Sequence, residues 1–204
     1  ANDEEMTNIP SAVNNTAAEF DKIPGIGPRA ALSYTYWLVT QPKESLKRFA
    51  QALTSLTENV QRCRTCGTWS EQEVCSICAN QNRDANVLCV VATSQDLRVI
   101  EVSGAFKGFY HVLGGLLDPI SGRTPETLSI NRLKERLLAP DSKIKEVILA
   151  FDPDVSGDTT ALYLTKLLSG LPVTISRLAR GLPTGAQLEY ADSSTLADAL
   201  RNRK

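Results

Sequence analysis

The chain has 204 residues, of which 42% are hydrophobic, and a formal net charge of −1. A chain of this length and composition can bury a core of its own, which excludes an intrinsically disordered protein. The near-neutral charge excludes a nonspecific polycation, so any contact with nucleic acid must come from local basic clusters.

Segments that direct a chain to or through a membrane are not evident. No run of eighteen or more apolar residues occurs, and residues 1–10 are acidic and polar, unlike a signal peptide. We therefore expect a soluble, cytoplasmic protein that does not associate with membranes.

The N-terminal part predicts short helices. Residues 1–16 are polar without apolar periodicity, and we expect a mobile tail there. Residues 17–22 predict the end of a short helix, and residues 23–28 contain the Gly and Pro signals of a compact turn. Residues 29–39 predict a second helix. The positions at core spacing in that helix are Ala31, Tyr34 or Thr35, and Leu38.

A third helix is predicted over residues 44–60, after Pro42 breaks the pattern. Its apolar positions recur at helical spacing and fall on one face, which indicates an amphipathic helix. These positions are Leu46, Phe49, Ala50, Leu53, Leu56 and Val60.

Four of the five cysteines form two close pairs, Cys63 with Cys66 and Cys75 with Cys78. Four thiolates at this spacing can surround one ion and leave no position open for water, so we expect one structural Zn²⁺ per chain. A rubredoxin-like iron site would use the same ligands, and a redox or disulfide pair is a further alternative. Cys89 lies within an apolar strand and is interpreted as a buried small hydrophobe.

The sequence IPGIGPR at 23–29 has the form of a helix-hairpin-helix turn. The amides of Gly25 and Gly27 can approach a phosphate, and Arg29 adds a full charge at the start of the next helix. The alternative is an ordinary turn between packed helices. Other basic residues either extend a DNA-binding track or simply belong to solvated surfaces. They are Lys43, Lys47, Arg48, Arg62 and Arg64.

After residue 83 short apolar strands alternate with helices, which predicts an α/β unit with a mainly parallel sheet. The predicted strands are 87–91, 108–113, 146–151 and 173–178. The predicted helices are 95–103, 130–138, 158–168 and a last short one at 194–201, which Asp192 or Ser193 could cap.

An acidic turn follows the strand at 146–151. Asp152 and Asp154 stand where α/β folds usually bind ligands and could hold Mg²⁺. The alternative is that Asp154, Ser156 or Asp158 caps the following helix. Metal-dependent catalysis would need a further acid or base, and the first strand offers no acid until Asp96.

Several motifs add a family resemblance. They are GFYHVLGG at 108–115, ALYL at 161–164, RGLP at 180–183 and LEYAD at 188–192. Together with the hairpin and the cysteine pairs, they resemble the RecR family of recombination mediators over about residues 20–203. The resemblance implies an α/β multidomain protein. Its parts would be a helix-hairpin-helix region at 1–60, a C4 zinc finger at 61–82, a Toprim domain at 83–178 and a Walker-B-like C-terminal tail at 179–204.

The resemblance also implies a function. The family forms a ring-like homotetramer that encircles DNA and works with RecO, and in some systems RecF, to help RecA displace single-strand-binding protein. We therefore expect a non-enzymatic clamp on single-stranded and double-stranded DNA in recombinational repair. One alternative is a Mg²⁺-dependent Toprim nuclease or primase-like enzyme, and another is a scaffold that binds only proteins.

The chain departs from the family pattern at three places. Ala92 and Thr93 stand where the family usually has glutamates, Asp-Pro-Asp at 152–154 replaces the usual Asn-Pro, and Ser33 stands where a second basic residue is common. The aspartates at 152 and 154 look more like a metal-binding Toprim enzyme, but the loss of the glutamates removes the acid that such an enzyme would use and argues against catalysis. Both changes put the RecO contact in question, and Ser33 leaves DNA affinity more dependent on other lysines and arginines.

Three acidic residues are nevertheless candidates for contact with a partner or a cation, namely Asp96, Asp152 and Asp154. His111, the only histidine, lies within the 108–115 motif and is assigned a structural role.

Overall fold

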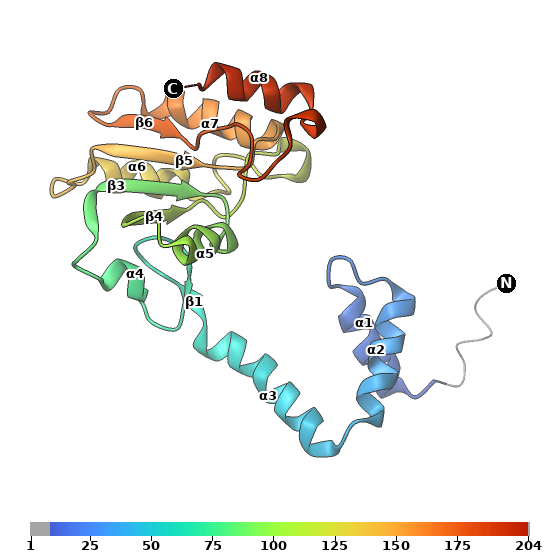
Figure 1. Cartoon of the computed structure of the whole chain (residues 1–204). Coiled ribbons are helices and arrows are strands. Elements are labelled where there is room, and N and C mark those ends of the chain that lie inside the picture. Colours follow the sequence, from blue (N-terminus) through green and yellow to red (C-terminus); the bar gives the residue numbers. More distant parts are fainter. Residues whose placement is uncertain (1–8, 204) are drawn as a thin grey trace. The chain divides into compact units, whose positions relative to one another are not determined.

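The computed structural model describes residues 9–203, and the chain divides into two compact units, one ending at Asn59 and the other beginning at Val60. Figure 1 shows the elements along the chain. The division lies at the end of the third helix, directly before the cysteine pairs.

The first unit contains three helices, α1 (Ser11–Asp21), α2 (Pro28–Thr40) and α3 (Lys43–Asn59). α1 and α2 pack against each other, and their buried side chains are Val13, Ala31, Thr35 and Leu38. Of the two alternatives at the centre of α2, Thr35 is therefore the buried one. The Thr35 hydroxyl donates to the Ala31 carbonyl at 2.9 Å, so this buried hydroxyl has a hydrogen-bond partner.

The prediction of an unstructured tail over residues 1–16 is wrong for its second part, because α1 begins at Ser11. The Pro10 carbonyl accepts the first helical hydrogen bonds, from the amides of Val13 and Asn14. Only Val13 is buried along the helix, so packing against α2 stabilises a segment whose sequence has almost no apolar periodicity. Residues 1–8 lie outside the described residues.

α3 forms where its periodicity predicts a helix, but no residue of it is buried. Its apolar face remains exposed in the single chain, with Leu53 at 51% and Leu56 at 60% exposure.

The second unit opens with a small antiparallel pair, β1 (Gln61–Arg62) and β2 (Trp69–Ser70), followed by the short helix α4 (Ser76–Ala79). The α/β part then contains four strands, β3 (Asp84–Val91), β4 (Gly108–Val112), β5 (Glu146–Ala150) and β6 (Thr174–Arg177). They form one sheet in the order β4-β3-β5-β6, and every pair is parallel, which confirms the predicted fold class.

Side chains alternate along the central strand β3 between two cores. Leu88 and Val90 face a large core that includes residues of α6 (Ile130–Leu138) and α7 (Val155–Leu168). Cys89 and Val91 face a smaller core with α5 (Ser94–Ser103). Helices thus cover both faces of the sheet, the arrangement that parallel strands require. The burial of Cys89 confirms its interpretation as a core residue.

The connections contain two 3-10 turns, η1 (Pro119–Ser121) and η2 (Leu188–Tyr190), and the chain ends in α8 (Ser193–Arg201). Asp192 caps α8, since its carboxylate accepts from the amides of Ser194 and Thr195. α7 begins three residues earlier than predicted, because Asp154 caps it.

Candidate metal centre and nucleic-acid interface

The four paired cysteines come together at the start of the second unit. The sulfurs of Cys63, Cys66, Cys75 and Cys78 all lie within 4.8 Å of one another, and those of Cys66 and Cys75 are 3.7 Å apart. Tetrahedral coordination with a Zn–S distance of about 2.3 Å places sulfurs about 3.8 Å apart. The geometry therefore fits a zinc ion with four thiolate ligands.

Local backbone bonds preform this arrangement. The Gly67 amide donates to the Cys63 carbonyl at 2.9 Å, and the Cys75 amide donates to the Cys63 sulfur at 3.3 Å. Gly67 has φ +81°, a left-handed conformation that closes the first turn and that other residues rarely adopt. The two Cys-x-x-Cys turns thus bring their sulfurs to one point.

The crowding of four sulfurs favours a bound cation over four free thiolates. Hydrogen bonding to the Cys75 sulfur raises the pKa of the Cys66 thiol to about 12, so the crowded sulfurs do not all ionise by themselves. A divalent ion that binds thiolates removes this conflict. The four cysteines hold one structural zinc, and no ligand position is left for water.

The zinc module is attached to the edge of the sheet. The Val112 amide of edge strand β4 donates to the Cys66 carbonyl at 2.8 Å. On the same strand, the Tyr110 carbonyl accepts from Arg136 of α6 at 2.7 Å. The module and Arg136 therefore occupy hydrogen-bonding groups that an edge strand would otherwise expose.

The glycine turn connects α1 and α2. Gly25 has φ +85°, and Gly27 precedes the first residue of α2, Pro28. Neither glycine nor Arg29 is buried, and a side chain at either glycine would meet nothing within 4 Å. The turn and the first amides of α2 are therefore open to an approaching anion.

The other predicted DNA-binding residues are exposed but differ in their contacts. In the first unit Lys47 pairs with Glu44 at 3.2 Å, and Arg48 donates to the Ser45 hydroxyl. Lys43 stands at the first position of α3.

In the second unit Arg64 pairs with Glu73 at 3.0 Å. Arg62 stacks over the indole ring of Trp69, with 4.1 Å to its centroid. Nothing in the sequence pattern indicates this stacked pair, because it depends on the β1–β2 register that sets Arg62 opposite Trp69.

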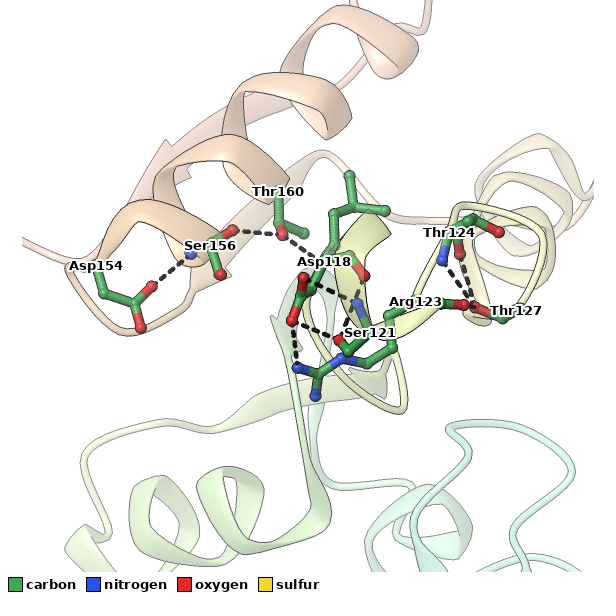
Figure 2. A network of polar contacts seen from close by, with 11 residues as sticks. Asp118, Ser121, Arg123, Thr124, Thr127, Asp154, Ser156 and Thr160 are labelled. Atoms are coloured by element: carbon green, nitrogen blue, oxygen red, sulfur yellow. Dashed lines mark hydrogen bonds and ion pairs between the residues drawn. The ribbon is translucent and has the colours of Figure 1, made fainter.

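The three acidic candidates lie at different places. Asp96 accepts from the amide and the hydroxyl of Thr93, both at 2.8 Å, and thereby completes the capping box of α5, whose N-cap is Thr93. Asp154 accepts from the Gly157 amide at 2.7 Å and caps α7 (Figure 2). Asp152 is exposed. Within residues 9–203, the cysteine cluster is the single group of three or more His, Cys, Asp or Glu ligands close enough to share a metal.

Figure 2 also shows how the loop after β4 is held against α7. The Thr160 hydroxyl accepts from the Leu117 amide at 2.9 Å and donates to the Ser156 carbonyl at 2.6 Å. Further along this loop Arg123 pairs with Asp118 at 3.1 Å. The loop is thus fixed by polar contacts that sequence reasoning did not identify.

Asp158 of α7 is paired with Arg177 and Arg180, and these hydrogen bonds lower the pKa of its carboxyl to about 2. The two arginines also line a polar groove of about 390 Å³ at the carboxyl ends of β5 and β6, next to Asp152. No helix among the described residues is both long and apolar enough to cross a membrane.

A four-cysteine zinc module set on the edge of a parallel α/β sheet, with a helical hairpin before it, defines a modular zinc-containing protein of the Toprim class. A Toprim domain model matches residues 86–179. The model of the RecR zinc finger, which has four cysteine ligands, matches residues 60–80, and the RecR C-terminal model matches residues 181–204.

The chain belongs to the RecR family. Recombination protein RecR of Treponema denticola is 44% identical over 193 residues, which cover 95% of this chain and 98% of the relative. The protein of the same name from Prochlorococcus marinus is 43% identical over 199 residues, covering 97% and 98%. That from Dehalococcoides mccartyi is 40% identical over 201 residues, again covering 97% and 98%.

Proposed function

We propose that this protein is a DNA-binding clamp in recombinational repair. It helps RecO, and in some systems RecF, to load RecA onto single-stranded DNA covered by single-strand-binding protein. Membership of the RecR family, whose relatives are named recombination proteins, supports this role. The proposed parts are a helical DNA-binding region at 1–60, a zinc finger at 61–82, a Toprim domain at 83–178 and a tail at 179–204.

The observation that carries the proposal is the open glycine turn at the start of α2. The turn presents Gly25, Gly27 and Arg29 to solvent at the positive end of a helix of 13 residues. Such a site binds phosphate oxygens and reads no bases, so it serves a protein that must accept any sequence. Lys43, Lys47 and Arg48 of the same unit extend the interface.

A net charge of −1 gives little long-range attraction for DNA. Retention on DNA therefore depends on closure around it, which requires several copies of the chain. The exposed apolar side chains of α3 supply a surface for self-association. They lie beside a groove of about 510 Å³ that also includes Phe20 and Trp37. We propose a homotetrameric ring, with further contacts through the C-terminal tail.

The clamp performs no covalent chemistry. Ala92 and Thr93 follow the first strand of the sheet, where a Toprim enzyme would place an acid, and a carboxylate oxygen of Asp154 is occupied by its cap. Asp152 is exposed beside the groove at the end of β5, and we propose that it contacts a partner protein.

The test is the salt dependence of DNA binding. In Arg29→Ala, the slope of log affinity against log salt should become shallower by about 1, with equal losses on all sequences. Lys143→Ala is the matched control, because Lys143 is an exposed cation in the loop before β5, outside the proposed interface. An unchanged slope in Arg29→Ala would remove the hairpin from the interface, and absence of binding by the wild type at low salt would contradict the clamp.

A further inference from the structure

A groove separates the zinc module from α5 in the second unit. It has a volume of about 450 Å³ and is bordered by Trp69 on the zinc module and by Ser94, Leu97, Arg98 and Val102 of α5. We call it the Trp69 groove.

Trp69 is available to a ligand, with 53% of its surface exposed. Arg62 lies directly opposite it in the β1–β2 register and places its guanidinium 4.1 Å from the ring centroid. Arg62 also donates to the Gly67 carbonyl at 3.0 Å, beside the metal ligands. The zinc module therefore holds a guanidinium and an indole together as one preformed π surface.

The charges around the groove favour an anion. Among residues 9–203, neither Arg62 nor Arg98 forms an ion pair. The carboxylate of Glu101, which also lines the groove, is held by Arg83 at 2.7 Å and by the Tyr110 hydroxyl at 2.9 Å. Arg62 and Arg98 thus lie at or beside the groove without an ion-pair partner in the described part of the chain, while the charge of Glu101 is neutralised by Arg83.

We propose that the Trp69 groove binds unpaired nucleobases of single-stranded DNA. A base stacks on the Trp69–Arg62 surface, and Arg98 contacts an adjacent phosphate. Stacking of this kind accepts every base, because each has a π face, but it excludes duplex DNA, whose base faces are already covered. The inference rests on the proposed function and adds a preference for single strands to it.

The experiment uses the full-length, zinc-loaded protein and compares its affinity for oligo(dT), for an abasic strand of equal length and for duplex DNA. Trp69→Leu should lower oligo(dT) affinity between about 5- and 100-fold and leave duplex affinity within about twofold. Trp69→Phe, which keeps a π face, should recover most of the loss. Tyr163→Leu is the matched control, since Tyr163 is an exposed aromatic residue of α7 in the same unit, outside the groove and outside the C-terminal tail. Zinc content and circular dichroism verify that each variant is folded.

A direct readout comes from fluorescence, because the chain has two tryptophans. In Trp37→Phe the indole emission comes from Trp69 alone, and oligo(dT) should quench this emission while the abasic strand should not. Equal loss of single-stranded and duplex affinity in Trp69→Leu, or no loss, would overturn the inference. So would loss of a protein partner with DNA binding unchanged. If the wild type binds DNA and Trp69→Leu binds it equally well, only this inference fails, whereas a wild type that binds no DNA refutes the proposed function.

Discussion

His111 makes the stability of the second unit depend on pH. The residue is 1% exposed in β4, and its Nε2 lies 3.0 Å from the Ser129 carbonyl, whereas its Nδ1 has no hydrogen-bond partner among the described residues. Burial lowers the pKa of His111 from 6.5 to about 4, although the Ser129 hydrogen bond opposes this shift. The positive charges of Arg136 and Arg132 lower it further.

The size of the stability change follows from the difference between the pKa of His111 in the folded and unfolded states. A pKa depressed by about 2.5 corresponds to about 3 kcal/mol, at about 1.36 kcal/mol for each pH unit. The folded state prefers neutral His111, so the stability is fully present above pH 6.5 and is lost as the pH falls from 6.5 to about 4. A protonated ring would leave an N–H group buried without an acceptor.

The assay is urea unfolding of the wild type and of His111→Gln at intervals between about pH 7.5 and pH 4. Because His111 is the only histidine, the difference between the two pH profiles reports this residue alone. Over this pH range the free energy of unfolding of the wild type should fall by about 3 kcal/mol relative to that of the variant. Parallel profiles would refute the reasoning, since they would mean that His111 titrates alike in the folded and unfolded states.

Three further perturbations test other parts of the structure. Cys66→Ser should purify without its zinc and should be poorly folded, because metal binding and local folding are one equilibrium; full zinc content by atomic absorption would contradict this. Arg83→Met should lower the free energy of unfolding by about 3 kcal/mol, because it leaves the half-buried carboxylate of Glu101 without its cation; a change below about 1 kcal/mol in denaturant unfolding would disagree. Asp154→Ala should lower the free energy of unfolding by about 1 kcal/mol through loss of the α7 cap, whereas Asp152→Ala should change it by less than about 0.5 kcal/mol. Equal thermal shifts in these two variants would argue against the cap.

Most of the fold was predictable from the pattern of apolar residues. The four strands of the sheet and the helices between them follow the predicted order, because buried parallel strands and amphipathic helices have different hydrophobic periods. The start of α1 at Ser11 was missed, because a polar helix that packs through Val13 has no such period.

The candidate site was predictable only in part. The zinc ligands were predictable because the spacing within each Cys-x-x-Cys pair is a local property. The assignments of Arg29, the other basic residues and the three acids to DNA, partners or cations stay predictions. The structure adds that Asp154 caps α7 and that Asp96 completes the capping box of α5.

The sequence by itself determined the metal centre, the glycine turn and the α/β class, since each depends on residues close together in the chain or on a regular period. Only the tertiary structure decided which groups from distant segments meet. It placed Arg62 over Trp69, Arg83 against Glu101 and the zinc module on the edge of β4. Strand register and packing between elements set these contacts, and neither can be predicted from the spacing of residues along the chain.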